Sequence, residues 1–223
     1  MSNFCSAGYQ IIEQLIDSQT VVNLRQAIAD NIDLQSDYGV RRLHRQIHLV
    51  NELAHSNLIL DFLHHQVDHS QFRLIKAIYF NKNANYNWSV PWHQDKTVAV
   101  TSKVELAGFK NWTTKQGVPH VQPPLNILEA ITTIRIALDN TNARNGGLKT
   151  LPRSHHLGIL NQAEINQIVQ QQSPIFLQMQ AGDALIMHPL ILHSSNKSMN
   201  QKSRRIIHLE YSSGDLPEEL AWY

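Results

Sequence analysis

The chain has 223 residues, of which 42% are hydrophobic and 17% charged, and its formal net charge at pH 7 is +1. This composition excludes a disordered chain and is typical of one globular domain with a sizeable core. Nucleic acid and membranes are not expected partners, because the chain has neither a basic stripe nor an apolar run long enough to span a bilayer. The single cysteine, Cys5, excludes an internal disulfide and a cysteine-rich zinc site.

The first part of the sequence predicts mainly helices. Residues 8–12 are typical of a short strand, and Asp17 or Ser18 can cap the helix that follows. A second helical stretch is expected at about residues 40–67, with its histidines on a polar surface. No basic segment followed by an apolar core is visible at the start, so we expect no signal peptide and a cytoplasmic protein.

The sequence after about residue 71 predicts strands and turns. Helices followed by many short strands predict an α+β fold in one domain, 1–223, with helices at about 1–70 flanking a core at about 71–213. A double-stranded β-helix, the jelly-roll or cupin-like architecture, is the natural form of that core. The long segment 103–126 is a candidate lid or binding loop. The expected strands are 72–80, 97–104, 131–138, 148–151, 175–179, 184–187 and 204–211, and a short helix is expected at 162–171.

A His-x-Asp motif, His93 and Asp95, lies between two strand-like segments. Such a triplet arises easily by chance in a chain with 13 histidines, so its context has to support it. On one strand the two side chains would point to the same face and could bind one metal ion. Together with His193 they make the two-histidine, one-carboxylate triad of non-heme Fe(II) sites, which leaves one face of the metal for a cosubstrate and O2.

The third ligand has a competitor in His188, which lies five residues before His193 and directly before a proline. We prefer His193, because a polar Ser-Ser-Asn stretch follows it and an arginine pair lies eleven residues further on. His208 and Glu210 form another His-x-acid pair, which we interpret as structural because it lacks a partner at comparable spacing.

The arginine pair, Arg204 and Arg205, is a candidate anchor for an acidic cosubstrate. Neighbours on a strand point to opposite faces, so one arginine should point into the barrel and the other away from it. A guanidinium binds a carboxylate through two parallel hydrogen bonds, which suits the tail of a dicarboxylate. We choose Arg204, with Arg205 as the alternative, and Ser195 can add a hydroxyl group to the same carboxylate.

Arg135 stands in an alternating segment, residues 131–139, whose polar face would line the barrel interior. There it would bind an acidic cosubstrate or substrate, or else form an ion pair with Asp139 or another buried acid. Three further residues are candidates for the pocket rim by position alone: Trp92, Trp112 and Lys115.

Several blocks of this sequence form a pattern that spans most of the chain. They are Trp92-His93-Gln94-Asp95, Leu138-Asp139 with Asn145-Gly146-Gly147-Leu148, Leu151-Pro152-Arg153-Ser154-His155, Gly182-Asp183, His188-Pro189-Leu190, His193 to Ser198, and Arg204-Arg205. With these blocks the chain resembles the phytanoyl-CoA dioxygenase family of Fe(II)/2-oxoglutarate oxygenases over about residues 8–211. One departure is Arg153, which stands where the family usually has glycine. The resemblance implies a double-stranded β-helix with Fe(II), 2-oxoglutarate and O2.

The resemblance also implies roles for individual residues. His93, Asp95 and His193 would hold Fe(II), and Arg204 would hold the far carboxylate of 2-oxoglutarate. The expected reaction is hydroxylation, or another oxidation, of a C–H bond in a small-molecule substrate, with release of succinate and CO2. The family does not identify that substrate. Asp95 argues against a halogenase, which usually lacks this carboxylate.

Two other functions are compatible with the same residues. Two histidines and a carboxylate also suit zinc with an open coordination position, as in a cupin-type hydrolase or isomerase. A non-catalytic sensor of 2-oxoglutarate or of another small molecule is the second alternative. The arginine after His193 favours the 2-oxoglutarate enzyme.

Overall fold

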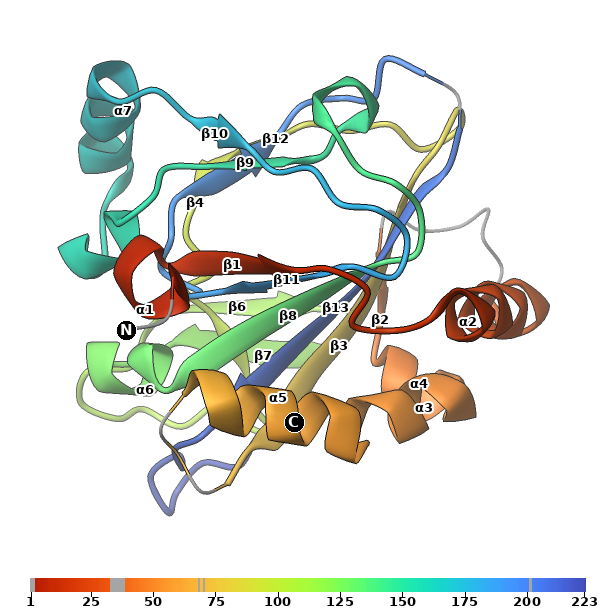
Figure 1. The fold of residues 1–223 in the computed structure, drawn as a ribbon. Helices are drawn as coiled ribbons and strands as arrows, with labels where there is room; N and C mark the ends of the chain where they lie inside the picture. Colours follow the sequence, from red (N-terminus) through yellow and green to blue (C-terminus); the bar gives the residue numbers. More distant parts are fainter. Residues whose placement is uncertain (1–2, 33–38, 68, 70, 201) are drawn as a thin grey trace.

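The computed structural model describes residues 3–32, 39–67, 69, 71–200 and 202–223. Within them the strands pair antiparallel in three sheets, and the helices gather outside (Figure 1). The largest sheet has six strands in the order β1-β11-β8-β13-β3-β2. These strands are β1 (Tyr9–Ile12), β2 (Gly39–Arg41), β3 (Arg73–Lys82), β8 (Ile131–Ala137), β11 (Ala184–Met187) and β13 (Arg204–Ser212).

A four-stranded sheet in the order β10-β9-β12-β4 lies opposite the six-stranded sheet (Figure 1). Apolar side chains of both sheets meet between them, among them Leu148 and Ile206. Two antiparallel sheets facing each other in this way are the arrangement of a double-stranded β-helix. The strands are β4 (Val90–His93), β9 (Leu148–Thr150), β10 (Ile175–Phe176) and β12 (His193–Ser195).

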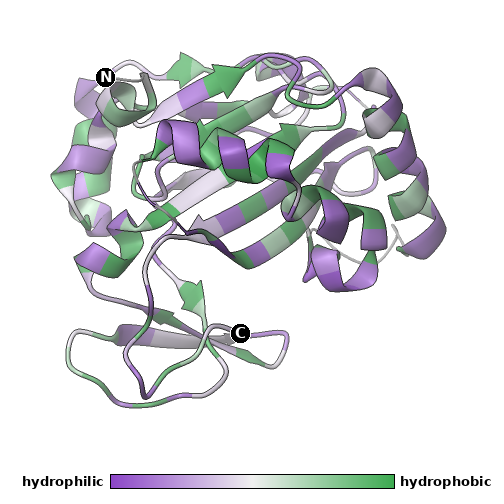
Figure 2. Cartoon of the chain, turned by 60° about the horizontal axis from the view of Figure 1, so that its bottom comes forward, coloured by the Kyte–Doolittle hydropathy of each residue, from purple (hydrophilic) through white to green (hydrophobic). Residues whose placement is uncertain are grey.

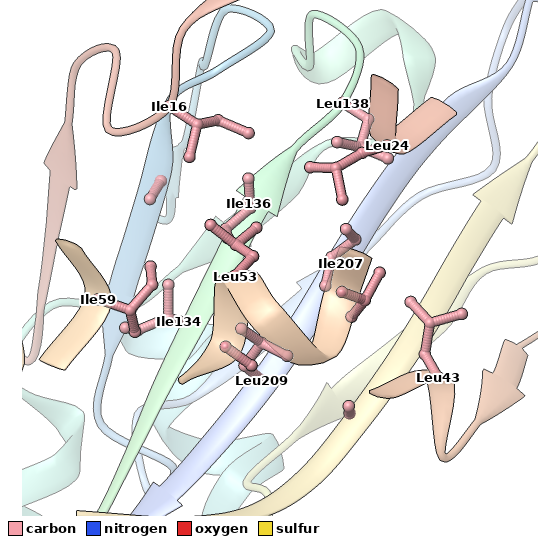
Figure 3. Packing of buried hydrophobic residues seen from close by; sticks show 14 of the residues in the cluster. Ile16, Leu24, Leu43, Leu53, Ile59, Ile134, Ile136, Leu138, Ile207 and Leu209 are labelled. Atoms are coloured by element: carbon pink, nitrogen blue, oxygen red, sulfur yellow. The ribbon is translucent and has the colours of Figure 1, made fainter. Parts of the chain in front are cut away.

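The other face of the six-stranded sheet is covered by helices, and the largest hydrophobic cluster lies between them (Figure 3). Leu24 and Ile59 come from the helices, and Ile134 and Ile207 from the sheet. Alternation along β8 and β13 turns Ile134 and Ile207 toward the helices and the residues next to them in sequence toward the opposite face of the sheet. The helices on this face are α2 (Ser18–Asn31), α3 (Leu43–Gln46), α4 (His48–Ala54) and α5 (Asn57–Gln66).

The single helical stretch expected at 40–67 is wrong. Strand β2 comes first and pairs with β3, and three separate helices follow. The backbone explains the breaks, because Arg42 is left-handed with φ 58° and Ile47 and Ser56 are extended. The histidines of this stretch do not all lie on its surface either, since His44 is half-buried.

The strand expected at 97–104 is much shorter, and the segment after it is not irregular. Strand β5 (Val98–Ala99) pairs with β7 (Val118–Gln122), which pairs with β6 (Lys110–Lys115). This three-stranded sheet lies beside the C-terminal residues (Figure 2), and Val98 and Val121 of it share a hydrophobic cluster with Ile75 of β3. Trp222 bridges to Val100 there.

The remaining helices are short. The helix expected at 162–171 is confirmed as α7 (Gln162–Gln171), and a capping box between Asn161 and Glu164 starts it. Arg153 has φ 68°, a conformation that glycine adopts without strain, so the glycine usual at this position has a backbone reason. No helix within the described ranges combines the length and the apolar character of a membrane span. The others are α1 (Asn3–Ala7), α6 (Leu125–Glu129), η1 (Ala143–Asn145) and η2 (Ser154–Leu157).

Replacement of Leu24 by alanine tests the helix-covered core. Leu24 is fully buried, so Leu24→Ala should lower the free energy of unfolding by about 2–5 kcal/mol. Val22→Ala, on the same helix but 53% exposed, should change it by less than about 0.5 kcal/mol. Urea unfolding of both variants measures the difference, and equal effects would contradict the assigned core.

Candidate metal and cosubstrate site

Two strands of the four-stranded sheet, β4 and β12, bring the predicted metal ligands together. His93 ends β4 and lies directly opposite His193, the first residue of β12, with 4.2 Å between the ring centroids. The sequence predicted Asp95 on the same strand as His93, but β4 ends at His93 and Asp95 lies just beyond it. Its backbone N–H donates to the carbonyl of Pro189 at 2.8 Å, which fixes the turn after the strand.

The three side chains converge closely enough for one metal ion. Asp95 Oδ1 lies 3.7 Å from Nε2 of His93, and Asp95 Oδ2 lies 3.5 Å from Nε2 of His193. One ligand atom from each of the three residues lies within 4.8 Å of the ligand atoms of the other two. A divalent ion with ligand bonds near 2 Å fits between atoms at such separations.

Backbone hydrogen bonds prepare both imidazoles for metal binding. Nδ1 of His93 lies 2.9 Å from the carbonyl of Pro91, and Nδ1 of His193 lies 2.9 Å from the carbonyl of Ile191. A carbonyl only accepts, so each Nδ1 carries the hydrogen and each Nε2 keeps its lone pair for a metal ion.

The electrostatic environment favours the same protonation states. Burial, and to a smaller extent the neighbouring His93, lower the pKa of His193 to about 3, so the imidazole is neutral. Burial alone would raise the pKa of Asp95, but the nearby His193 and His93 hold it below its ordinary value. Neutral imidazoles and an ionised carboxylate are the forms that bind metal.

A second cluster, Asp95 with His208 and Glu210, also has ligand atoms close together. Its groups are already engaged, however. Arg135 donates to Nδ1 of His208 at 2.9 Å, so Nε2 of His208 carries the hydrogen and donates to Glu210 at 2.9 Å. Glu210 also forms an ion pair with Lys76 at 2.6 Å. With both His208 nitrogens engaged, this cluster is less suited to a metal ion than the first.

The sequence pattern indicated a structural role for His208 and Glu210 and did not predict that they lie beside Asp95. The signal that could have found them is the alternation along β13, which turns Arg204, His208 and Glu210 to one face. The rejected third ligand, His188, lies elsewhere. Its ring lies tilted against that of His155 with 5.1 Å between centroids, and its Nδ1 accepts from the backbone N–H of Leu190.

The two arginines of the pair point in different directions, as expected for neighbours on a strand. Arg204 is 4% exposed and lines the same pocket as the triad. Its guanidinium has no hydrogen-bond or ion-pair partner among the described residues, and burial lowers its pKa to about 9. Arg205 instead donates twice to Asp139, at 2.7 and 2.8 Å, and Asp139 also pairs with Arg25.

Lys82 is a pocket residue that sequence analysis missed. It is fully buried, and its Nζ donates to Ser195 Oγ at 2.8 Å and to the carbonyl of Asn196 at 2.7 Å. Burial, together with the nearby Arg204 and Arg135, lowers its pKa to about 7. Alternation along β3 could have identified it, because Lys82 shares the pocket face with Lys76.

Arg135 lines the pocket, but it does not pair with Asp139. Besides donating to His208, its guanidinium lies over the ring of Phe80, 5.5 Å from the centroid, and its Nε has no partner among the described residues. Of the three expected rim residues only Lys115 lines the pocket. Trp92 and Trp112 pack against hydrophobic clusters instead.

Comparison with known proteins gives the fold a context. The chain is similar to AviO1 from Streptomyces viridochromogenes Tue57, with 19% identity, coverage of 96% of this chain and 94% of that chain, and a TM-score of 0.68. HygX from Streptomyces hygroscopicus, whose crystal structure contains nickel and 2-oxoglutarate, is 14% identical, with 94% and 84% covered and a TM-score of 0.65. EctD from S. alaskensis, with 2-oxoglutarate and 5-hydroxyectoine, is 15% identical, with 94% and 73% covered and a TM-score of 0.72.

These similarities confirm the expected α+β class with a double-stranded β-helix core. No curated protein matches the chain. The sequence model of the family described as phytanoyl-CoA dioxygenase matches residues 4–206. Since that match spans most of the chain, the protein belongs to the phytanoyl-CoA dioxygenase family of iron- and 2-oxoglutarate-dependent oxygenases.

Proposed function

We propose that the protein oxidises a C–H bond of a small molecule, by hydroxylation or a related reaction, and that it uses Fe(II), 2-oxoglutarate and O2 and releases succinate and CO2. In this proposal His93, Asp95 and His193 hold the iron. Family membership and the donor set support it, because two Nε2 lone pairs and an ionised carboxylate suit ferrous iron.

The observation that carries the cosubstrate assignment is the unpaired, buried cation at one end of the pocket. A buried charge without a partner is costly, so Arg204 requires an anion that binds there. The far carboxylate of 2-oxoglutarate would accept from Arg204, with Lys82 and the Ser195 hydroxyl beside it. A further contact between Arg135 and the cosubstrate stays a prediction.

Bound iron would supply the oxidising chemistry, with 2-oxoglutarate as the source of two of the electrons. The chain's own residues bind and orient. The backbone carbonyls of Pro91 and Ile191 hold the two imidazole rings in the metal-binding tautomer. Apolar groups on the pocket wall, Ile78, Phe80 and Leu148, exclude water near the reacting carbon.

An anaerobic titration with Fe(II) and 2-oxoglutarate tests the metal ligands. The parent should develop the weak visible charge-transfer band of the chelate complex, and His193→Ala should lose it because one of three ligands is gone. His188→Ala is the matched control and should keep the band. If His188→Ala loses it and His193→Ala keeps it, the third ligand is misassigned. Tight Fe(II) binding by the parent without a band would favour a hydrolase, isomerase or sensor.

The same titration separates the two arginines. Arg204→Gln should weaken 2-oxoglutarate binding about 10- to 100-fold, since hydrogen bonds between charged groups contribute about 1.5–3 kcal/mol. Arg205→Gln should leave 2-oxoglutarate binding unchanged and lower thermal stability, because it breaks the ion pair with Asp139. The reverse outcome would assign the cosubstrate to Arg205.

Two lysines that both contact Asn196 test the role of Lys82. Lys82→Met should weaken 2-oxoglutarate binding about tenfold, as expected for the loss of one charge-assisted contact. Lys149→Met removes a lysine that donates to Asn196 Oδ1 but does not line the pocket, so binding should stay unchanged. Equal affinities in the two variants would remove Lys82 from the cosubstrate site.

A further inference from the structure

The pocket has a second basic region, at the end away from Arg204. It is formed by Arg41 on β2, Lys76 on β3 and Lys115 on β6. The same three residues also line an adjoining cavity that reaches Arg42 and Tyr223. In all, the pocket is lined by six lysine or arginine side chains and two carboxylates, although the whole chain has a net charge of only +1.

Strand geometry separates the two basic regions. Lys76 and Lys82 are six residues apart on β3 and both line the pocket, so their Cα atoms are about 20 Å apart at the rise of a β-strand. Pairing with β13 sets Lys82 opposite Arg204 at one end and Lys76 opposite Glu210 at the other. A five-carbon diacid that chelates the metal and reaches Arg204 is too short to reach the second region as well.

The cations of the second region are not all neutralised within the protein. Lys76 has Glu210 at 2.6 Å and donates to the backbone carbonyl of Thr97. Within the described part of the chain, the one hydrogen-bond partner of Lys115 is a neutral group, the Thr97 hydroxyl, at 3.4 Å. The guanidinium of Arg41 has no hydrogen-bond or ion-pair partner among the described residues, although it is half-buried.

The side chains in this region repel one another. Burial lowers the pKa of Lys115, and the nearby Lys76 and Arg41 lower it further, whereas Asp95 and Glu210 act in the opposite direction. Burial also lowers the pKa of Arg41, whereas Glu210 acts in the opposite direction. Like charges held together in a partly desolvated pocket create a positive potential that attracts an anion.

We propose that Arg41 and Lys115 bind an anionic group of the substrate, a phosphate monoester or a carboxylate, while the carbon to be oxidised lies next to the metal. The assignment of this anion to the substrate rests on the proposed function. The binding of an anion at this place is independent of that function, because it depends only on the two cations. A planar guanidinium with an ammonium group beside it matches the several acceptor oxygens of either anion.

Titration of the metal-free protein with two probes, inorganic phosphate and octanoate, tests the proposal by calorimetry. Each titration is run without and with 2-oxoglutarate. We expect at least one probe to bind, and Arg41→Gln and Lys115→Met to weaken it about tenfold or more. Phosphate binding alone indicates a phosphate monoester, octanoate binding alone indicates a carboxylate, and binding of both indicates a general anion site.

The controls separate this region from the rest of the molecule. Lys110→Met removes an exposed lysine from the same strand as Lys115 and should leave probe binding unchanged. Arg204→Gln should weaken 2-oxoglutarate but not the probe, and Arg41→Gln should do the opposite. Binding of neither probe, or equal losses in Lys110→Met and Lys115→Met, would overturn the proposal. Probe binding without a charge-transfer band would overturn the proposed function alone.

Discussion

Antiparallel pairing of β13 with β3 fixes where charge lies in the pocket. The register sets Arg204 against Lys82, His208 against Ile78, and Glu210 against Lys76. Every second residue faces the pocket and the others face the helices, so a slip by one residue would put charges into the hydrophobic core. The apolar contacts on the helix side therefore hold the polar side in register.

The two ends of this strand pair solve the problem of buried charge differently. At one end Glu210 neutralises Lys76 and accepts from His208, which satisfies these groups within the protein. At the other end Arg204 and Lys82 lie together without a carboxylate among the pocket-lining residues near them, and burial lowers the pKa of each. The end with Arg204 and Lys82 is therefore adapted to bind an anionic ligand. Its uncompensated charges lower the stability of the folded protein when no anion is bound.

Much of the fold and of the metal site was predictable from the sequence, because both depend on local sequence patterns. Strand-like segments predicted β8, β11 and β13 closely, and the grouping of His93, Asp95 and His193 followed from their residue types together with the Ser-Ser-Asn stretch and the arginine pair after His193. The breaks between β2, α3, α4 and α5 were not predictable, since backbone conformations such as the left-handed Arg42 depend on tertiary contacts. Lys82 was missed because a lone charged residue on a strand gains meaning only from the strand opposite it, which here carries Arg204.

The pairing of His93 with His193 has a consequence for how the chain holds together. These residues lie on neighbouring strands, yet nearly half of the chain, including the three-stranded sheet and α7, lies between them in sequence. A metal ion bound to both would act as a cross-link that closes this long loop, and it would bind the folded chain far better than the unfolded one. The ion would thus stabilise the fold, and more so the further its free concentration exceeds its Kd, so that loss of iron would loosen the β4–β12 edge of the barrel as well as stop the chemistry.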